Sequence, residues 1–562
     1  MLDQWIAEAR AGRPVWIGDV REGCPDAVPV VLQLQLQDGG LRQLSMPLPR
    51  WQTPEQRDFV SRYAAACVYN ALSAFSAREA AFYLDLREED AAAALLGQME
   101  EVFQVHRTRR SGYGKVINIA DRLCRGFGGG AFSFAIRDIR RLPPLPETKP
   151  EGGALLPRLR QAVRRTDRGV CCGIDVGGTD IKAAVSRDGR LLCVKEYDWD
   201  PASSPTAEGI LAPMELLVRL MACCAAGPIT PQLRRALRRD ATDREMAQAV
   251  AAHPAAKPDV LGVSFPDIVI RDKVAGGETP KMKGMRDNPA LNYEAAFGEI
   301  RELRQRLLPL CAPGAAVHLA NDGHIAAFTA AAELAFSGDV PDLSGGVIAH
   351  SLGTDFGFGC LLPDGSIPQT PMELYDFLLD LGSLHRAQLP PEDLRSIRNE
   401  NSGLAGARRY LGQAAAFRLA AERQPRLLTG FARREEGLLT IPGDLRKPCL
   451  EHLMDRAQAG DPDARWVFRQ VGVHLGQISR ELDWLMVPET QVRYLFGRFV
   501  KSPVCFRLMA EGCRSVLPRL RLEAADEDLA CTPLMRDLAG QDVTVAQFGQ
   551  AVGAMYFAAM EP

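Results

Sequence analysis

The feature that most limits how this chain can fold is a pattern that occurs twice. It consists of an apolar strand, a short turn with glycine and threonine, and a second strand. The first copy joins GVCCGIDV (169–176) to IKAAVS (181–186), and the second joins GGVIAHS (345–351) to FGFGCLL (356–362). Strand-like and helical segments alternate after each copy, so the sequence predicts a duplicated α/β fold.

Apolar periodicity predicts the elements that follow each copy. After the first copy we expect helices near 207–226, 231–251, 293–308 and 323–336, and strands at 259–265 and 315–320. After the second copy we expect a mostly helical insertion over about 370–465, a helix at 463–486, a strand at 492–496 and a C-terminal helix at 543–560.

The first 150 residues are predicted to form a separate α+β domain of unknown role. VPVVLQLQLQ (28–37) is typical of a strand, and the Ala-rich segments 55–75 and 77–103 are typical of helices. LPPLPETKPEGG (142–153) has the composition of a linker. We therefore predict three domains, at 1–150, 165–340 and 341–562.

Bulk composition argues against several classes of partner. The formal net charge is −3, which gives no general attraction to nucleic acid or to an anionic membrane. No stretch approaches 18 uninterrupted apolar residues, and the N-terminus lacks the apolar core of a signal peptide. None of the 14 cysteines has zinc-finger spacing, so we expect buried, reduced thiols. These features predict a cytoplasmic protein.

Both turns carry residues suited to binding phosphate. Glycines let backbone N–H groups approach an anion without interference from a Cβ atom, and threonine adds a hydroxyl donor. Asp175 ends a buried strand, where a carboxylate is unfavourable unless it faces a cation. A tight hairpin without a ligand is the alternative for each turn. The candidate phosphate-binding residues are Gly177, Gly178 and Thr179 in the first turn and Gly353 and Thr354 in the second.

A further polar pair, Asn321-Asp322, lies between the predicted strand 315–320 and an Ala-rich helix. A carboxylate at the end of a strand and the start of a helix can act as a general base, or it can simply cap the helix. The segment alone leaves both interpretations open.

Together these motifs resemble the ROK family of sugar kinases and repressors, within the sugar kinase/Hsp70/actin superfamily. IDVGGTDIKAAV and HSLGTDFGFG resemble its phosphate motifs, LANDGHIAAF the motif with the catalytic aspartate, and LGVSFPDIV (261–269) the strand and turn that lead to the sugar loop. NSGLAGARRYLG (401–412) and VRYLFGRFV (492–500) fall where the family has its adenosine-side segments. The resemblance covers about 170–515 and implies a duplicated ribonuclease H-like, actin-like ATPase core with two lobes and a cleft.

The resemblance also implies an activity, ATP- and Mg²⁺-dependent phosphorylation of a sugar-like hydroxyl. Asp322 would be the catalytic base, Asn321 a substrate contact and Asp175 the residue that helps to hold Mg²⁺. Gly497 and Lys182 would join the residues of the two turns in binding ATP.

Three departures from the family pattern affect the substrate. The family's cysteine-rich zinc motif is missing, so we expect no structural zinc. The sugar loop carries Lys281 and Lys283, and Glu373 is followed by Asp376 where the family has a sugar-binding histidine. Lysines usually stay in solvent at a cleft's rim, which is the expected outcome here, but an ammonium pointing inward would favour an anionic substrate. Glu373 and Asp376 favour a polyol or amino sugar.

Two alternatives to a kinase stay open. Residues 76–102 are faintly similar to a helix-turn-helix, which suggests a regulator, although acidic residues outnumber basic ones there. The altered motifs also fit a non-catalytic ATP- or sugar-binding scaffold. The predicted partner is a small sugar-like molecule, with no nucleic acid and no membrane; a homodimer is a candidate assembly.

Overall fold

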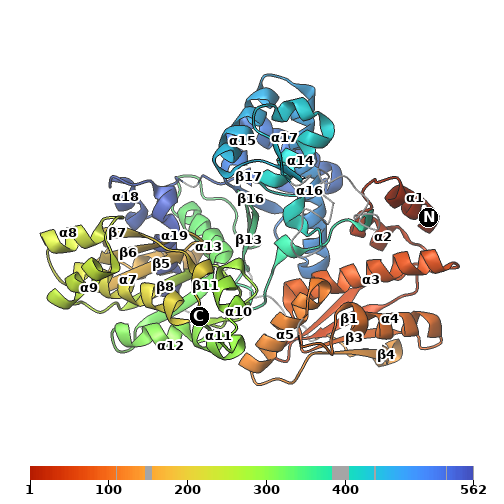
Figure 1. Cartoon of the computed structure of the whole chain (residues 1–562), viewed down its shortest axis with the longest axis horizontal. Coiled ribbons are helices and arrows are strands. Elements are labelled where there is room, and N and C mark those ends of the chain that lie inside the picture. Colours follow the sequence, from red (N-terminus) through yellow and green to blue (C-terminus); the bar gives the residue numbers. More distant parts are fainter. Residues whose placement is uncertain (109, 146–154, 383–403, 436–437, 527, 561–562) are drawn as a thin grey trace. The chain divides into compact units, whose positions relative to one another are not determined.

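The computed structural model describes residues 1–108, 110–145, 155–382, 404–435, 438–526 and 528–560. The chain forms two compact units, shown with their elements in Figure 1. The first unit combines residues 1–149, 350–358 and 370–524, and the second combines 150–349, 359–369 and 525–562. The predicted three-domain division stays a prediction.

The second unit is built on a mixed sheet with strand order β11-β8-β5-β6-β7. The strands β5, β6 and β7 are antiparallel neighbours, whereas β8 and β11 run parallel to β5. The strands are β5 (Val170–Val176), β6 (Asp180–Arg187), β7 (Arg190–Asp198), β8 (Val260–Phe265) and β11 (Ala316–Asn321), with a small pair of β9 (Val269–Ile270) and β10 (Lys273–Val274). All the strands predicted from the first copy of the pattern are therefore confirmed.

The helices of the second unit pack against this sheet and against one another. The helices are α6 (Leu155–Arg165), α7 (Glu208–Ala226), α8 (Pro231–Leu237), α9 (Asp243–Ala252), α10 (Lys283–Asp287), α11 (Tyr293–Arg301), α12 (Leu303–Leu307), α13 (Asp322–Ala335), α18 (Pro533–Ala539) and α19 (Val545–Ala559). Within the described part of the chain, α7 is the one helix long and apolar enough to cross a membrane. Of its most apolar window, 61% is buried, which is typical of a core helix.

The C-terminal helix α19 lies directly on the sheet of the second unit. A Cβ atom at Gly173 would be 1.8 Å from the carbonyl oxygen of Ala551, and one at Gly262 would be 1.8 Å from that of Ala554. Glycine at these two strand positions therefore lets helix backbone touch strand backbone. This packing attaches the last segment of the chain to strands that lie about 290 to 380 residues earlier.

A second sheet has the strand order β13-β12-β16-β17. In this sheet β16 lies beside β12, the first strand of the hairpin, and β17 lies beside β16. In the second unit β8 lies beside β5 and β11 beside β8 in the same order. The shared order fits the predicted duplicated α/β pattern. The strands are β12 (Val347–Leu352), β13 (Phe356–Leu361), β16 (Val492–Phe496) and β17 (Arg521–Ala524); α14 (Gln413–Arg423), β14 (Arg433–Glu435), β15 (Leu438–Thr440), α15 (Gly443–Gln458), α16 (Pro462–Met486) and α17 (Pro503–Val516) complete this part.

The N-terminal part of the first unit has its own sheet, with strand order β2-β1-β3-β4. Its elements are α1 (Leu2–Arg10), α2 (Ile17–Gly23), β1 (Val31–Gln35), β2 (Leu41–Ser45), α3 (Pro54–Phe75), β3 (Glu79–Leu84), α4 (Glu89–Val102), α5 (Lys115–Gly126) and β4 (Ser133–Asp138). The long helix α3 runs beside this sheet (Figure 1).

One predicted helix in this part is wrong. The segment 77–103 holds the strand β3 and then the helix α4, because EAAFYL is buried as an inner strand between β1 and β4. The same finding removes the helix-turn-helix interpretation of 76–102, since that segment contains one helix rather than two. The acidic face of α4 also lacks the basic residues that a DNA-reading helix requires.

A buried ion pair joins the N-terminal part to α16 within the first unit. The Arg21 Nη2 donates to Glu481 Oε1 at 2.7 Å, and both side chains are at most 5% exposed. The side-chain amide of Asn70 on α3 donates to the same carboxylate, donates to the carbonyl oxygen of Leu378 and accepts from the backbone N–H of Leu378. These contacts connect α2 and α3 to α16 within the first unit.

The cysteines match the sequence-based expectation. All 14 are free, and all except Cys24 and Cys531 are buried. Burial raises the pKa of several of these thiols, including Cys67 to about 12, and so keeps them protonated and unreactive.

Candidate functional site

The first glycine turn lies between β5 and β6 and is held at both ends by hydrogen bonds. Gly177 N donates to Asp180 O at 2.8 Å, which closes the turn. The Trp199 indole N–H donates to Gly177 O at 3.2 Å, and its backbone N–H donates to Thr179 O at 3.0 Å. The tip, Gly178 and Thr179, is exposed. The turn therefore presents backbone N–H groups and a hydroxyl from a rigid base.

The two glycines of this turn differ in what the fold requires of them. A Cβ atom at Gly177 would lie 2.8 Å from two oxygens of Asp180, so packing excludes a side chain there. A Cβ atom at Gly178 would meet only the Cε atom of Lys281, at an ordinary 3.5 Å. Since neither conformation nor packing demands glycine at 178, the open space above it is suited to a ligand.

Asp175 lies directly before this turn, at the end of β5. It is 9% exposed, and the Ser264 hydroxyl of β8 donates to its Oδ1 at 2.6 Å. Burial raises the pKa of Asp175 to about 6, with a smaller contribution from the Asp322 carboxylate. Lys182, which faces Asp175 across the strands, donates instead to Asp180. The carboxylate is thus buried beside a second negative charge, an arrangement that a cation would stabilise.

Asp322 is the first residue of α13, immediately after β11. Its Oδ1 accepts from Gly323 N at 2.9 Å, and Gln550 of α19 fixes its backbone by donating to its carbonyl oxygen at 2.8 Å. Burial raises the pKa of Asp322, while the positive charge of Lys281 lowers it. These contacts place a partly desolvated carboxylate where it can accept a proton.

Asn321 has a structural role beside it. Its Oδ1 caps α13 by accepting from Gly323 N at 2.9 Å, and its Nδ2 donates to the carbonyl oxygen of Asp267 at 3.1 Å. The amide therefore ties the start of α13 to the loop after β8. Contact with a substrate stays a prediction for this residue.

The loop that carries Lys281 is firmly built. Asp267 Oδ2 accepts from Gly277 N at 2.9 Å, and the Tyr293 hydroxyl donates to Gly277 O at 2.5 Å. Arg286 donates to the carbonyl oxygens of Gly277 and Thr279 at 2.9 and 2.7 Å. Such contacts hold the short turn Pro280–Met282 in one conformation.

The two lysines of this loop have different environments. Lys283 is exposed and pairs with Asp287 along α10, as expected of a rim lysine. Lys281 is instead half-buried, with its Cε next to Gly178 and its charge felt by Asp322. The sequence predicted a rim position for both, because a pattern of residues in a loop does not show which side chain points inward.

The second glycine turn belongs to the first unit. Gly353 N donates to Asp355 O at 3.0 Å, and Gln413 N, at the start of α14, donates to Gly353 O at 3.0 Å. A Cβ atom at Gly353 would have only Asp355 O within reach, at 4.0 Å. Like Gly178, this glycine has no packing reason for lacking a side chain, and the neighbouring Thr354 is exposed.

Gly497 has a clear structural reason to be glycine. Its φ is +95°, and a Cβ atom would lie 2.4 Å from the carbonyl oxygen of Leu352, the last residue of β12. The predicted adenosine-side segment thus packs directly on the second glycine turn. Part of the other such segment, 401–403, lies outside the described residues.

Glu373 and Asp376 also belong to the first unit. Glu373 N donates to Ser73 O at 3.0 Å, which attaches this segment to the end of α3. Asp376 ends the short turn Leu374–Asp376, and both carboxylates are half-buried. The two candidates are therefore anchored on the N-terminal part, and their role in binding a substrate stays a prediction.

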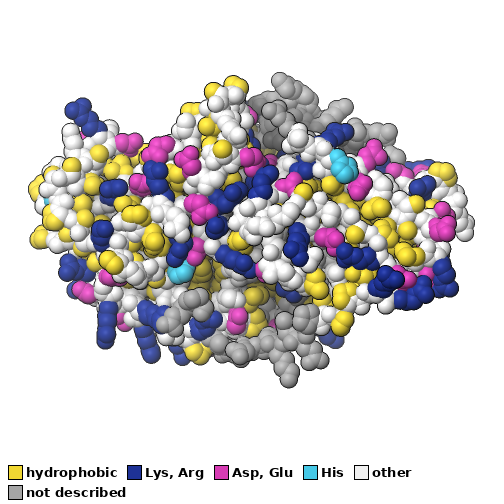
Figure 2. Space-filling model, turned by 90° about the horizontal axis from the view of Figure 1, so that it is seen from below, with side chains coloured by type: hydrophobic (Ala, Val, Ile, Leu, Met, Phe, Trp, Pro, Cys, Tyr) yellow, Lys and Arg dark blue, Asp and Glu magenta, His cyan; other side chains and the backbone are white. Residues whose placement is uncertain are grey.

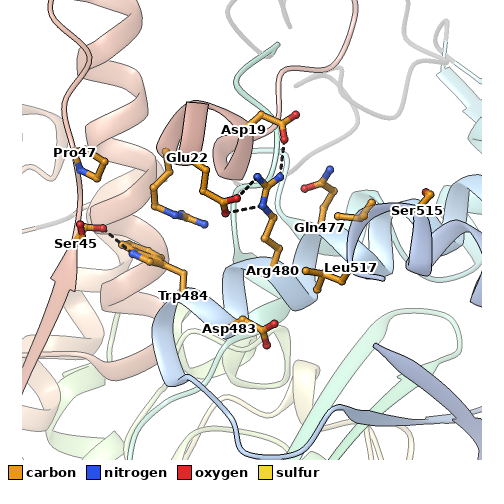
Figure 3. A pocket seen from close by; sticks show the side chains of 12 residues that line it. Asp19, Glu22, Ser45, Pro47, Gln477, Arg480, Asp483, Trp484, Ser515 and Leu517 are labelled. Carbon is orange, nitrogen blue, oxygen red and sulfur yellow. Dashed lines mark hydrogen bonds and ion pairs between the residues drawn. The ribbon is translucent and has the colours of Figure 1, made fainter. Parts of the chain in front are cut away.

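A separate pocket of about 670 Å³ lies in the first unit, lined by residues of α2, α16 and the end of α17. Figure 3 shows Arg480 pointing to Asp19 and Glu22, and the Trp484 indole N–H donating to Ser45 O. The charged groups that line it are largely paired with one another, and none of the predicted site residues lines it. It forms part of the joint between α2 and α16.

On the face drawn in Figure 2, Lys and Arg side chains are interspersed with acidic and hydrophobic ones. In the described ranges, no group of three or more His, Cys, Asp or Glu side chains is placed to hold a metal ion. The absence of structural zinc stays a prediction.

Comparison with known proteins gives matches among solved structures only. No family model and no curated protein matches the sequence. A ROK family glucokinase from Streptomyces griseus, solved with glucose and AMPPNP, matches at 20% identity over 69% of this chain and 98% of its own, with a TM-score of 0.36. A ROK hexokinase from Thermus thermophilus matches at 17% identity over 68% and 97%, with a TM-score of 0.38.

A ROK family transcriptional regulator, a homologue of the E. coli MLC protein, matches at 15% identity over 70% of this chain and 81% of its own, with a TM-score of 0.38. The structures matched thus belong to the family that the motifs resemble. At TM-scores below 0.5 they assign no activity to this chain.

Proposed function

We propose that this chain is an ATP-dependent phosphotransferase that transfers the γ-phosphoryl group to a hydroxyl of a sugar or sugar-like small molecule. The observation that supports it is the convergence, within one unit, of an exposed glycine turn and two strand-end carboxylates, the buried Asp175 and the half-buried Asp322. The motif resemblance adds the type of reaction. Under this proposal the two related sheets are the lobes of a ribonuclease H-like ATPase core.

Asp322 would serve as the general base. The acceptor's hydroxyl oxygen attacks the γ-phosphorus, the bond to the β-phosphate oxygen breaks, and ADP leaves with that electron pair. Asp322 accepts the hydroxyl proton, for which its raised pKa is suited. Its fixed backbone, bonded to Gln550, keeps the base in place, so most of the catalysis comes from positioning.

The backbone N–H groups at Gly178 and Thr179 would bind phosphate oxygens, together with the Thr179 hydroxyl. Lys182 is engaged by Asp180, so it would contribute charge near the turn rather than a direct bond. Gly353 and Thr354 offer the same chemistry in the first unit, where Gly497 supports their turn by close packing.

Asp175 is suited to Mg²⁺. This cation is commonly held by one or two carboxylates together with water and substrate phosphates, so a single buried carboxylate is sufficient. Burial and the nearby Asp322 raise the pKa of Asp175, so a bound cation would stabilise the ionised form of this carboxylate. When bound, Mg²⁺ supplies positive charge to the phosphate oxygens.

The experiment is an assay of ADP formation from ATP and Mg²⁺ with hexoses, amino sugars, sugar acids and polyols. For the best acceptor, Asp322→Asn should lower kcat by roughly 10²–10⁴-fold, the usual contribution of a positioned base. ATP affinity should change little, because Asn can still accept from Gly323 N.

Near-normal turnover by Asp322→Asn would rule out its role as the base. The specific rival is a non-catalytic nucleotide- or sugar-binding protein, favoured by Asp376 in place of the family's histidine. ATP binding by calorimetry with no ADP formation across the panel would favour that rival.

A further inference from the structure

Lys281 is a half-buried cationic group of the second unit, and the motif resemblance does not explain its place beside the glycine turn. Its Cε lies 3.5 Å from the position of a Cβ atom on Gly178, so the side chain extends over the exposed tip of the phosphate turn. In the described part of the chain, no carboxylate lies within ion-pair distance of its ammonium. Its charge is therefore available to a ligand.

The surrounding loop fixes the backbone that carries this lysine. Its backbone belongs to a turn anchored by Asp267, Arg286 and Tyr293. A Cβ atom at Gly284, three residues further along the chain, would lie 2.4 Å from Ser204 O, so the following helix also packs closely. A lysine held over a phosphate turn is positioned like a clamp on a transferring phosphoryl group, where charge develops in the transition state.

We propose that Lys281 is a catalytic residue whose ammonium contacts the transferring γ-phosphoryl group, beside the Gly178 turn and opposite Asp322. This inference rests on the proposed phosphotransferase function. Lys281 stays protonated throughout, while Asp322 takes the proton of the acceptor hydroxyl. The position over the glycine turn assigns the lysine to the phosphoryl group that every acceptor receives, and not to an anionic group on one acceptor.

The test compares Lys281→Met, Lys281→Arg and the control Lys283→Met, a change on the same loop at an exposed residue. With a neutral and an anionic acceptor alike, Lys281→Met should lower kcat by roughly 10²–10³-fold, the usual loss for one transition-state donor. ADP affinity should stay within about twofold, and binding of ADP with aluminium fluoride should be lost. Lys281→Arg should recover part of kcat, and Lys283→Met should behave as wild type.

Several results would overturn the inference. Wild-type kcat in Lys281→Met, with a raised KM for anionic acceptors only, would assign the lysine to the acceptor. An equal loss in Lys283→Met would indicate a general disturbance of the loop. If the wild type neither binds ADP nor forms it from ATP, the proposed function itself fails, and this inference fails with it.

Discussion

At the scale of single residues, the contrast between glycines separates positions that the fold needs from positions that a ligand needs. Oxygens of Asp180 leave no room for a side chain at Gly177. Gly178 has an ordinary backbone conformation and open space where a side chain would point. A substitution at Gly178 therefore tests ligand binding without disturbing the fold, and Gly177 offers a matched control in the same turn.

Gly178→Ala should keep or slightly raise the free energy of unfolding, because alanine restricts the unfolded chain by about 0.4–1 kcal/mol. Its affinity for ATP should fall by about tenfold or more, since the new methyl group occupies the approach to the backbone. Gly177→Ala should lower both stability and affinity. Calorimetry and thermal unfolding measure these effects, and unchanged ATP affinity in Gly178→Ala would remove this turn from the site.

His324, two residues after Asp322, makes stability depend on pH. It is buried, its Nδ1 accepts from Cys360 N at 3.1 Å, and burial lowers its pKa to about 4. The folded chain thus keeps a neutral imidazole, while the unfolded chain takes up a proton below about pH 6.5. The contribution to stability is present above pH 6.5 and is lost as the pH falls toward 4.

His324→Asn should flatten this dependence, because its Oδ1 can accept the same hydrogen bond but cannot be protonated. Between pH 7 and pH 4.5, urea unfolding should show the wild type losing about 2–3 kcal/mol more than the variant. Parallel losses in the two proteins would mean that His324 is not the group responsible. Burial raises the pKa of Glu333, which changes stability with pH in the opposite direction. Both proteins contain Glu333, so its effect cancels in this comparison.

At the scale of elements, the sequence predicted what is encoded locally. The two hairpins and the strand 492–496 were found to within a residue or two, because apolar runs broken by glycine turns carry their own signal. The strand β3 was mistaken for helix because alanine favours helices, while its neighbours β1 and β4, distant in sequence, bury it as a strand.

The site was predicted in part for the same reason. The glycine turns and strand-end carboxylates are local motifs, and Asp175 and Asp322 lie together because β5, β8 and β11 are parallel neighbours. Ser264, Trp199 and the inward direction of Lys281 depend on tertiary packing, and no local pattern marks them. The backbone contact of α19 on β5 and β8 is likewise a long-range feature, signalled only by glycines inside predicted strands.

That contact makes Gly262 a test of how α19 is held. Gly262→Ala would place a methyl group 1.8 Å from Ala554 O, so the helix must move away from the sheet and stability should fall by roughly 3 kcal/mol or more. Gly298→Ala in α11, where nothing lies within 4 Å, should instead raise stability by up to about 1 kcal/mol. Thermal unfolding checks both, and equal stability of the two variants would contradict the close packing.

At the scale of the whole molecule, neither compact unit is one continuous stretch of the sequence. Residues 1–149 are grouped with 370–524, and 525–562 return to the unit that begins at 150. The N-terminal part therefore completes the unit that contains the second glycine turn, and its own sheet is connected to α16 by side-chain contacts. Among these, the Arg21–Glu481 pair is the most deeply buried.

This pair predicts strong coupling across the joint. Arg21→Met leaves the Glu481 carboxylate buried and unpaired, and should cost about 3–5 kcal/mol. Glu481→Gln should leave the Arg21 guanidinium buried without its partner and should lower stability in the same way. The loss of stability in the double variant should be about 2–3 kcal/mol smaller than the sum of the two single losses. The exposed Arg50–Glu88 pair, at 2.7 Å, is the control and should show coupling below about 1 kcal/mol.

The four stabilities of each cycle are measured by chemical unfolding followed by Trp484 fluorescence. Trp484 reports on this joint because the Arg21 guanidinium lies 4.3 Å from the centroid of its ring. Equal coupling in both pairs would show that the N-terminal part is held by other contacts.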